Sequence, residues 1–134
     1  MALYHRWSKA QKVATFLAAI FYVFAGSLHF VRPEMYLRIM PPYIPSHPAM
    51  VRISGFFEIA GGLGLLLKQT RRAAAWGLVA LLIAVFPANL YMATNPAEAG
   101  ALAIAPALRW GRLPIQALLI WWVLWCTRTR ESFR

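Results

Sequence analysis

The sequence predicts an all-α integral membrane protein whose four helices form an up-down bundle. Hydrophobic residues make up 60% of the 134 residues and charged residues only 13%, whereas ordinary globular domains have about 45–50% and about 25%. A domain of this size has a large surface for its volume, so it cannot hide that much apolar area from water. The charges also lie in short clusters between long apolar runs, which is typical of membrane proteins.

Four apolar runs are candidates for membrane-spanning helices within a single membrane domain that covers residues 1–134. A helix needs about 20 mainly apolar residues to cross the hydrocarbon core. The four predicted spans are Val13–Val31, Ala49–Leu67, Ala73–Ala93 and Ala107–Cys126. The fourth span carries Arg109 and Arg112 in its first turns, where long basic side chains can reach the lipid headgroups.

Prolines mark the predicted boundaries of these helices. Pro33 disfavours a helical conformation at the residue before it, so the first span ends there. The proline-rich stretch Met40–Pro48 is predicted to be an irregular loop, and Pro96 closes the third span in the same way. The segment Glu98–Ala105 is compatible with either a short surface helix or a loop.

The orientation follows from the number of Lys and Arg residues on each side of the membrane. One side carries nine of them, namely Arg6, Lys9, Lys12, Lys68, Arg71, Arg72, Arg128, Arg130 and Arg134. The other side carries five, namely Arg32, Arg38, Arg52, Arg109 and Arg112. Since the number of spans is even, both termini are predicted on the more basic side, which is the cytoplasmic side of a bacterial inner membrane.

The charge, the single cysteine and the N-terminus each allow another interpretation. The net charge of +10 does not predict nucleic-acid binding, because the basic residues are placed as membrane anchors. Cys126 is the single cysteine, so an intrachain disulfide is excluded; it is predicted to be a buried small residue, with lipidation as the alternative. A cleaved signal peptide is the alternative for the first span, since Ala25–Ser27 resembles a cleavage site. The apolar run continues past Ser27, which favours a span.

Glu58 is the polar residue that fits a membrane span least well. An ionisable group inside a span costs roughly 2.5–3.5 kcal/mol on insertion scales, so it calls for a partner or a function. Glu58 lies nine residues after Ala49, or about 13 Å along the helix. Gly55, Gly61 and Gly62 share its helix face and allow a neighbouring helix to approach closely, or leave space beside the carboxyl group.

Each of the other three spans has a polar residue in its outer half, at a depth similar to that of Glu58. These residues are His29, Asn89 and Gln116. Because consecutive antiparallel helices are neighbours in a bundle, these residues and Glu58 are predicted to converge on one polar site. The loop that contains Tyr43 would cover the site, and Arg52 lies at its mouth. The predicted ligand-binding residues are therefore His29, Glu58, Asn89, Gln116, Tyr43 and Arg52.

The alternative for this cluster is a structural role. Polar residues in membrane bundles often form hydrogen bonds between helices, each worth about 0.6 kcal/mol on average. For Glu58 the structural alternative is an ion pair with His29 or an arginine that only fixes helix packing. The location of all four polar residues in one leaflet favours a common site.

The sequence predicts neither a metal site nor a covalently bound cofactor, and no catalytic residue is assigned. The methionines Met35, Met40, Met50 and Met92, together with His29 and His47, have the thioether and imidazole groups that suit copper. No pair of them has the spacing of metal ligands on a predicted helix.

Several strings of the sequence resemble a known family. They are AGSLHFVRPEMY (Ala25–Tyr36), GFFEIAGGLGLLL (Gly55–Leu67), RRAAAWG (Arg71–Gly77), FPANLYMA (Phe86–Ala93) and LPIQALLIWWVLW (Leu113–Trp125). Together they resemble the DoxX-like family of small four-helix membrane proteins, over about Ala18 to Trp125. The polar positions of that family fall on His29, Glu58 and Asn89.

The resemblance implies topology more than chemistry. Some DoxX-like proteins are membrane subunits of quinone-linked sulfur oxidation, others belong to redox-defence complexes, and related eukaryotic proteins act as assembly factors for membrane receptors. This chain lacks paired cysteines, which argues against a thiol relay.

Two functional hypotheses follow. The first is an auxiliary subunit of a membrane redox system, which binds a lipophilic, quinone-like ligand in a largely apolar pocket with a few polar groups; its electrons would come from a membrane or peripheral redox protein. The second is a non-enzymatic assembly factor or scaffold, in which the glycine face Gly55–Gly62 recognises a partner transmembrane helix.

Overall fold

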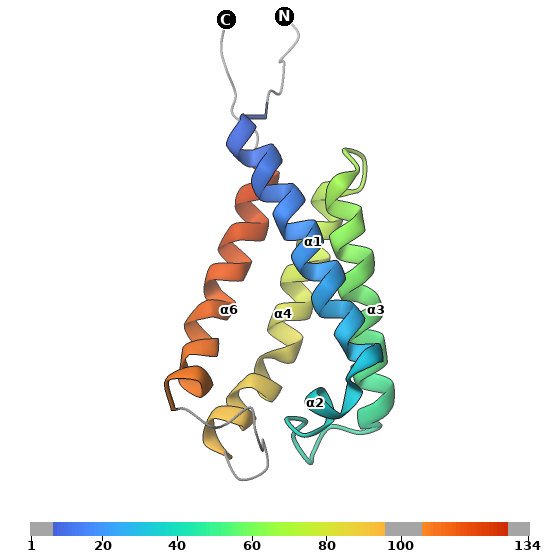
Figure 1. Ribbon diagram of the computed structural model, residues 1–134, viewed down its shortest axis with the longest axis vertical. Helices are drawn as coiled ribbons and strands as arrows, with labels where there is room; N and C mark the ends of the chain where they lie inside the picture. Colours follow the sequence, from blue (N-terminus) through green and yellow to red (C-terminus); the bar gives the residue numbers. More distant parts are fainter. Residues whose placement is uncertain (1–6, 96–105, 129–134) are drawn as a thin grey trace, which may run out of the picture.

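The computed structural model describes residues 7–95 and 106–128, and within these ranges the chain is entirely α-helical. The helices are α1 (Lys9–Val31), α2 (Pro33–Leu37), α3 (His47–Leu66), α4 (Arg71–Thr94) and α6 (Pro106–Thr127) (Figure 1). The predicted all-α class is therefore confirmed for the part of the chain that the structure describes. The segment Glu98–Ala105 and the basic residues Arg6, Arg130 and Arg134 lie outside it.

Local sequence signals explain where the first helices begin and end. Ser8 caps α1 in a reciprocal capping box, since Gln11 N donates to Ser8 Oγ (3.1 Å) and Ser8 N donates to Gln11 Oε1 (3.1 Å). Pro33 ends α1 and becomes the first residue of α2, where its missing N–H is not needed. The chain therefore turns sharply at Arg32 and folds α2 back toward α1.

The start of α3 differs from the prediction. The helix begins at His47, two residues before the expected Ala49, and the predicted loop Met40–Pro48 is correspondingly shorter. The physical reason is that Pro48 lies in the first turn of α3, where proline is favoured rather than disruptive. His47 Nε2 lies 3.0 Å from the Pro41 carbonyl oxygen and ties the loop to the helix start.

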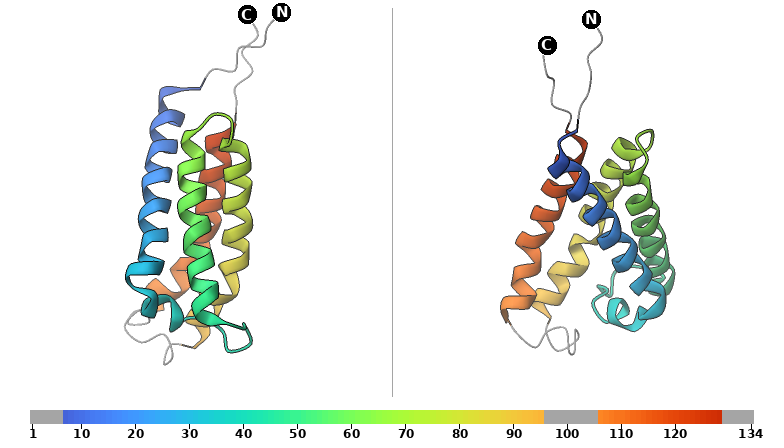
Figure 2. Two further views of the ribbon diagram at one scale, coloured as in Figure 1. Left: turned by 90° about the vertical axis from the view of Figure 1, so that its right-hand side faces the viewer. Right: turned by 45° about the horizontal axis from the view of Figure 1, so that its top comes forward.

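The four long helices run alternately up and down, side by side (Figures 1 and 2). The closest pairs are α1 with α3, α3 with α4, and α4 with α6. The helices α1 and α6 meet near the two ends of the described chain, where Gln11 Nε2 donates to the Arg128 carbonyl oxygen at 2.5 Å. They diverge toward the opposite end, which we call the α2 end.

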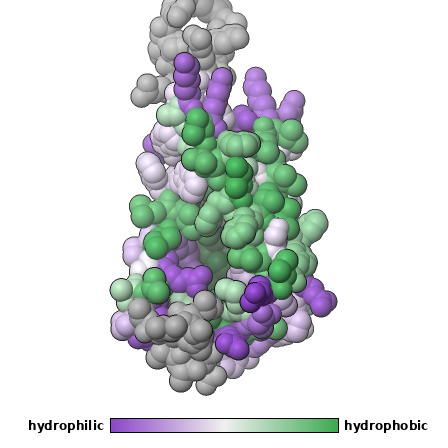
Figure 3. Space-filling model, viewed as in Figure 1, coloured by the Kyte–Doolittle hydropathy of each residue, from purple (hydrophilic) through white to green (hydrophobic). Residues whose placement is uncertain are grey.

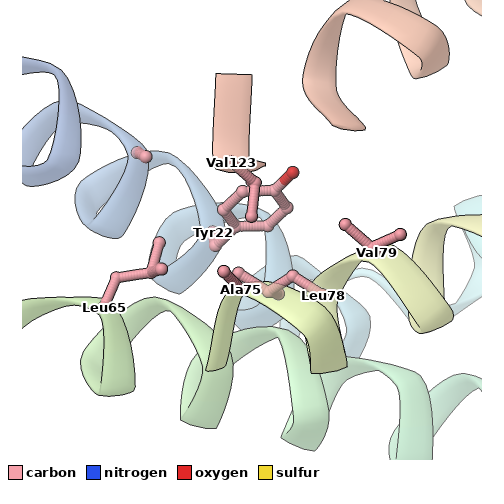
Figure 4. Close-up of a cluster of buried hydrophobic side chains, with 7 residues drawn as sticks. Tyr22, Leu65, Ala75, Leu78, Val79 and Val123 are labelled. Carbon is pink, nitrogen blue, oxygen red and sulfur yellow. The ribbon is translucent and has the colours of Figure 1, made fainter. Parts of the chain in front are cut away.

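A hydrophobic core joins all four long helices in the half of the molecule away from the α2 end (Figure 4). It consists of Ala18, Tyr22, Leu65, Ala75, Leu78, Val79 and Val123, each less than one tenth exposed. Because apolar side chains from every long helix meet there, this core holds the two diverging sides together. Among the described residues, the buried cluster nearer the α2 end, Ile39, Ala88 and Met92, does not join all four long helices.

The helices α1 and α3 cross at backbone distance because of glycine. A Cβ atom on Gly55 would lie 2.9 Å from the Gly26 carbonyl oxygen, and one on Gly62 would lie 3.0 Å from the Ala19 carbonyl oxygen. Any larger residue at Gly55 would therefore push the helices apart. This close crossing brings the side chains beside it, including those of His29 and Glu58, into contact.

The outer surface is strongly apolar along most of its length, with hydrophilic residues at both ends (Figure 3). Large apolar side chains such as Phe24 (65% exposed) and Leu118 (62%) point outward, far more than a soluble monomer of this size displays. The helices α1, α3 and α4 are each long and apolar enough to cross a membrane. These observations indicate a membrane protein. The fourth expected span, α6, does not reach the same hydropathy, because its first half contains Arg109, Arg112 and Gln116.

Candidate functional site

His29 and Glu58 form a close pair across the α1–α3 crossing. His29 Nε2 lies 2.7 Å from Glu58 Oε2, and the two side chains are 9% and 17% exposed. The other ring nitrogen, Nδ1, lies 2.8 Å from the Val51 carbonyl oxygen on α3. The distance is that of an ion pair, but the direction of the ring does not satisfy hydrogen-bond geometry, and Oε2 has no other partner among the described residues. At 2.7 Å, unprotonated lone pairs on Nε2 and Oε2 would repel each other.

The contacts of His29 determine where its proton lies. A backbone carbonyl can only accept, so Nδ1 must carry a hydrogen and donate it to the oxygen of Val51. In a neutral ring the opposite nitrogen, Nε2, would then be a bare acceptor facing a carboxyl oxygen. A proton on either the imidazole or the carboxyl group would make this contact favourable. His29 and Glu58 therefore form one coupled acid–base pair across the α1–α3 crossing.

Tyr36, on α2, covers the histidine ring. Its ring stacks on that of His29 with centroids 3.7 Å apart and planes 23° from parallel. The Tyr36 hydroxyl donates to the Ala25 carbonyl oxygen at 3.2 Å, which fixes the stack to α1. Burial, with a smaller contribution from the Glu58 carboxylate, raises the pKa of Tyr36 to about 12, and Arg112 acts in the opposite direction. The phenol is therefore neutral and holds the His29 ring in one orientation.

Asn89 and Gln116 form a second pair, between α4 and α6. Asn89 Nδ2 donates to Gln116 Oε1 at 2.8 Å, and Gln116 Nε2 donates to the Leu82 carbonyl oxygen at 2.6 Å. Leu82 precedes Ile83, whose carbonyl oxygen lacks a helical hydrogen bond because Pro87 has no N–H group. This pair has the hydrogen bonds expected of a contact that joins two helices.

The structure thus arranges the predicted site residues as two pairs. His29 with Glu58 joins α1 to α3, whereas Asn89 with Gln116 joins α4 to α6. Within residues 7–95 and 106–128, no hydrogen bond or ion pair connects the two pairs. The two pairs are called the two polar walls of the α2 end, and their convergence on one ligand site stays a prediction.

Tyr43 and Arg52 are not brought into either pair. Tyr43 is 74% exposed and Arg52 is also exposed. Tyr43 lies in the loop that packs at Ile39 and Pro41, with its own side chain pointing outward. Arg52 follows Val51 on α3, and a step of one residue turns a helical side chain about 100° away from the histidine that Val51 binds.

The surface of the molecule is also hollowed at the α2 end. The surface is hollowed between the α1 side and the α4–α6 side in this half of the molecule, with hydrophilic residues on both sides (Figure 3). The opening results from the divergence of α1 and α6 (Figure 1). Because α1 and α6 are both apolar on their outer faces, an entrance between them would face lipid rather than water.

Tyr36 is the site residue that sequence reasoning missed. The signal that could have found it is Pro33, which reverses the chain after α1. A residue three positions after that reversal can return to the last turns of the same helix.

Two other interpretations are also affected by the structure. In the glycine face Gly55–Gly62, Gly55 and Gly62 pack against α1 and Gly61 packs against Leu78 of α4, so a partner helix would have to use another surface. No group of three or more His, Cys, Asp or Glu side chains that could hold a metal ion lies in the described ranges.

Comparison with known proteins places the chain in one family. The family described as Domain of unknown function (DUF8561) matches residues 17–127, which include all the long helices apart from the first turns of α1. The chain therefore belongs to this family. No curated protein and no solved structure matches it.

Proposed function

We propose that this member of the DUF8561 family is an integral membrane protein that binds a small lipophilic, quinone-like ligand at the α2 end. In this proposal α1, α3, α4 and α6 all cross a bacterial inner membrane as an up-down bundle. Both termini are cytoplasmic, so the α2 end faces the outer leaflet. The resemblance to the DoxX-like family supports the same topology and a role as an auxiliary subunit of a membrane redox system.

The observation that carries the proposal is the 2.7 Å contact between His29 Nε2 and Glu58 Oε2, at which the proposal places one shared proton. A carbonyl oxygen of a quinone accepts a hydrogen bond, and the corresponding hydroxyl of the reduced form donates one. A group that holds one proton between two acceptors suits both forms, because it can donate to the first and accept from the second. The Glu58 side chain retains 17% exposure, while its Oε2 atom is buried.

The surroundings also suit a ligand of this kind. Apolar helices border the opening, and the Asn89–Gln116 pair supplies amide groups on the far wall. A pocket with an apolar body and few polar groups is typical of sites for small lipophilic molecules. The electrons for any redox step would come from a partner redox protein, and this chain would bind the ligand and exchange its proton.

The test is to extract bound lipophilic molecules from the full-length protein purified in mild detergent. Wild type is compared with Glu58→Gln and with Glu34→Gln, an exposed glutamate on α2 at the same end of the molecule. We expect a quinone in stoichiometric amount from wild type and Glu34→Gln, and little from Glu58→Gln. A folded wild-type protein that yields no quinone when its host membrane is rich in it would contradict the proposal.

A further inference from the structure

Two arginines near the start of α6 are turned inward. Arg109 and Arg112 are three residues apart and therefore share one face of the helix. Both are half-buried, and both contact α4. The other arginines predicted on this side of the membrane, Arg32, Arg38 and Arg52, are exposed. The inward pair is thus distinct from side chains that simply reach outward to the lipid headgroups.

The hydrogen bonds of the two guanidinium groups are few and weak. Arg109 Nη1 donates to the Ala93 carbonyl oxygen at 3.3 Å, while its Nε is buried and has no partner in the part of the chain that the structure describes. Arg112 Nη1 donates to the Met92 sulfur at 3.1 Å, and a thioether is a poor acceptor. Each guanidinium group has five N–H donors, so most of them lack a protein acceptor among the described residues.

Among the described residues, no acidic side chain pairs with either of these two arginines. The two acidic side chains there are Glu34, which is exposed, and Glu58, which is paired with His29. Partly buried cations without an anion are unfavourable, whereas an oxyanion can accept two parallel hydrogen bonds from each guanidinium group.

We propose that Arg109 and Arg112 bind one anionic headgroup, a phosphate group, at the α4–α6 edge of the α2 end. The residues around them favour a lipid as its source. Leu108 and Trp110 flank Arg109 and are 64% and 50% exposed, so acyl chains can lie along them while the phosphate contacts the guanidinium groups. Tryptophan is typical of this interfacial depth, and basic pockets between membrane helices bind acidic lipid headgroups. This site is separate from the His29–Glu58 pair and does not depend on the proposed quinone ligand.

The experiment is a titration of the full-length protein in neutral detergent, followed by native mass spectrometry. The probes are short-chain phosphatidylglycerol, short-chain phosphatidylcholine and sodium phosphate. The test variant is Arg109→Gln/Arg112→Gln, and the control is Arg52→Gln, which removes an exposed arginine at the same end. We expect wild type to prefer phosphatidylglycerol over phosphatidylcholine, the double variant to bind it about tenfold more weakly, and Arg52→Gln to match wild type.

The remaining outcomes decide between the sources of the anion. Phosphate that binds as tightly as phosphatidylglycerol would show that the site takes a free anion and would overturn the lipid assignment. Equal losses in the double variant and in Arg52→Gln would show general surface charge and overturn the site. Tighter phosphatidylglycerol binding by Glu98→Gln would show that the chain supplies its own anion and would also overturn it.

Variants that keep the charge guard against a folding artefact. Arg109→Lys/Arg112→Lys retains two cations but not the planar fork of donors. If the glutamine variant fails to fold, the folded lysine variant provides the test. We expect it to bind phosphatidylglycerol detectably but more weakly than wild type does. Lysine variants that bind as well as wild type would overturn the assignment of a guanidinium-specific site.

Discussion

At the residue scale, the chemistry of the proposed site depends on which ring nitrogens of His29 donate hydrogen bonds. The Val51 carbonyl oxygen accepts from Nδ1, which leaves Nε2 facing Glu58 Oε2 at 2.7 Å, and the proposed function places a shared proton at that contact. The identities of His29 and Glu58 could be predicted from their depth in apolar runs. Their mutual contact could not, because it depends on the rotation of two helices about their axes. Tyr36 was missed for the same kind of reason, since its position follows from the chain reversal at Pro33.

The residue-scale prediction concerns the stability of Glu58 variants. Glu58→Ala leaves Nε2 of a buried histidine without its partner, so we expect the free energy of unfolding to fall by about 3 kcal/mol. Glu58→Gln should lose less than half of that, because the amide nitrogen can donate to Nε2 of the neutral ring. The measurement is unfolding by sodium dodecyl sulfate in mixed micelles. Equal losses for the two variants would argue against a proton shared by this pair.

At the element scale, helix boundaries were largely predictable, whereas helix pairing was not. Pro33 ended the first helix as expected, and Pro48 moved the start of α3 earlier, because proline suits a first turn. The glycines on α3 predicted a close approach, but the sequence does not say which helix approaches. Arg71 illustrates the same limit, since its Nε donates to the Leu65 carbonyl oxygen at 2.7 Å and caps α3 from the next helix. It was expected only as a membrane anchor.

The element-scale prediction compares two glycines in long helices. In Gly55→Ala the new Cβ would lie 2.5 Å from His29 Cβ and 2.9 Å from the Gly26 carbonyl oxygen, so we expect a loss of about 1–3 kcal/mol from overpacking. In Gly77→Ala nothing lies within 4 Å of the new Cβ, and the better helix propensity of alanine should raise stability by about 0.5–1 kcal/mol. The same unfolding assay measures both. A neutral Gly55→Ala variant would contradict the close α1–α3 crossing.

At the scale of the whole molecule, the two polar pairs are kept apart by the divergence of α1 and α6. The core around Tyr22 and Val123 holds the four long helices together at one end, and the other end opens between its two walls (Figures 1 and 3). The sequence predicted that the polar residues share one half of the molecule. It could not predict the opening, because the tilt between helices is set by side-chain packing summed over their whole length.

The most direct test of a ligand between the two walls is photolabelling with a lipophilic quinone that carries a photoreactive group. The full-length protein in lipid nanodiscs is irradiated, and the labelled peptides are identified by mass spectrometry. We expect labels on both walls, in peptides that contain His29 to Tyr36 and Asn89 or Gln116. Excess unlabelled quinone and the Glu58→Gln substitution should remove them, while Glu34→Gln should not. Labels confined to outward-facing residues such as Phe24 and Leu118, unchanged by competitor and by Glu58→Gln, would contradict a quinone site at this end of the molecule.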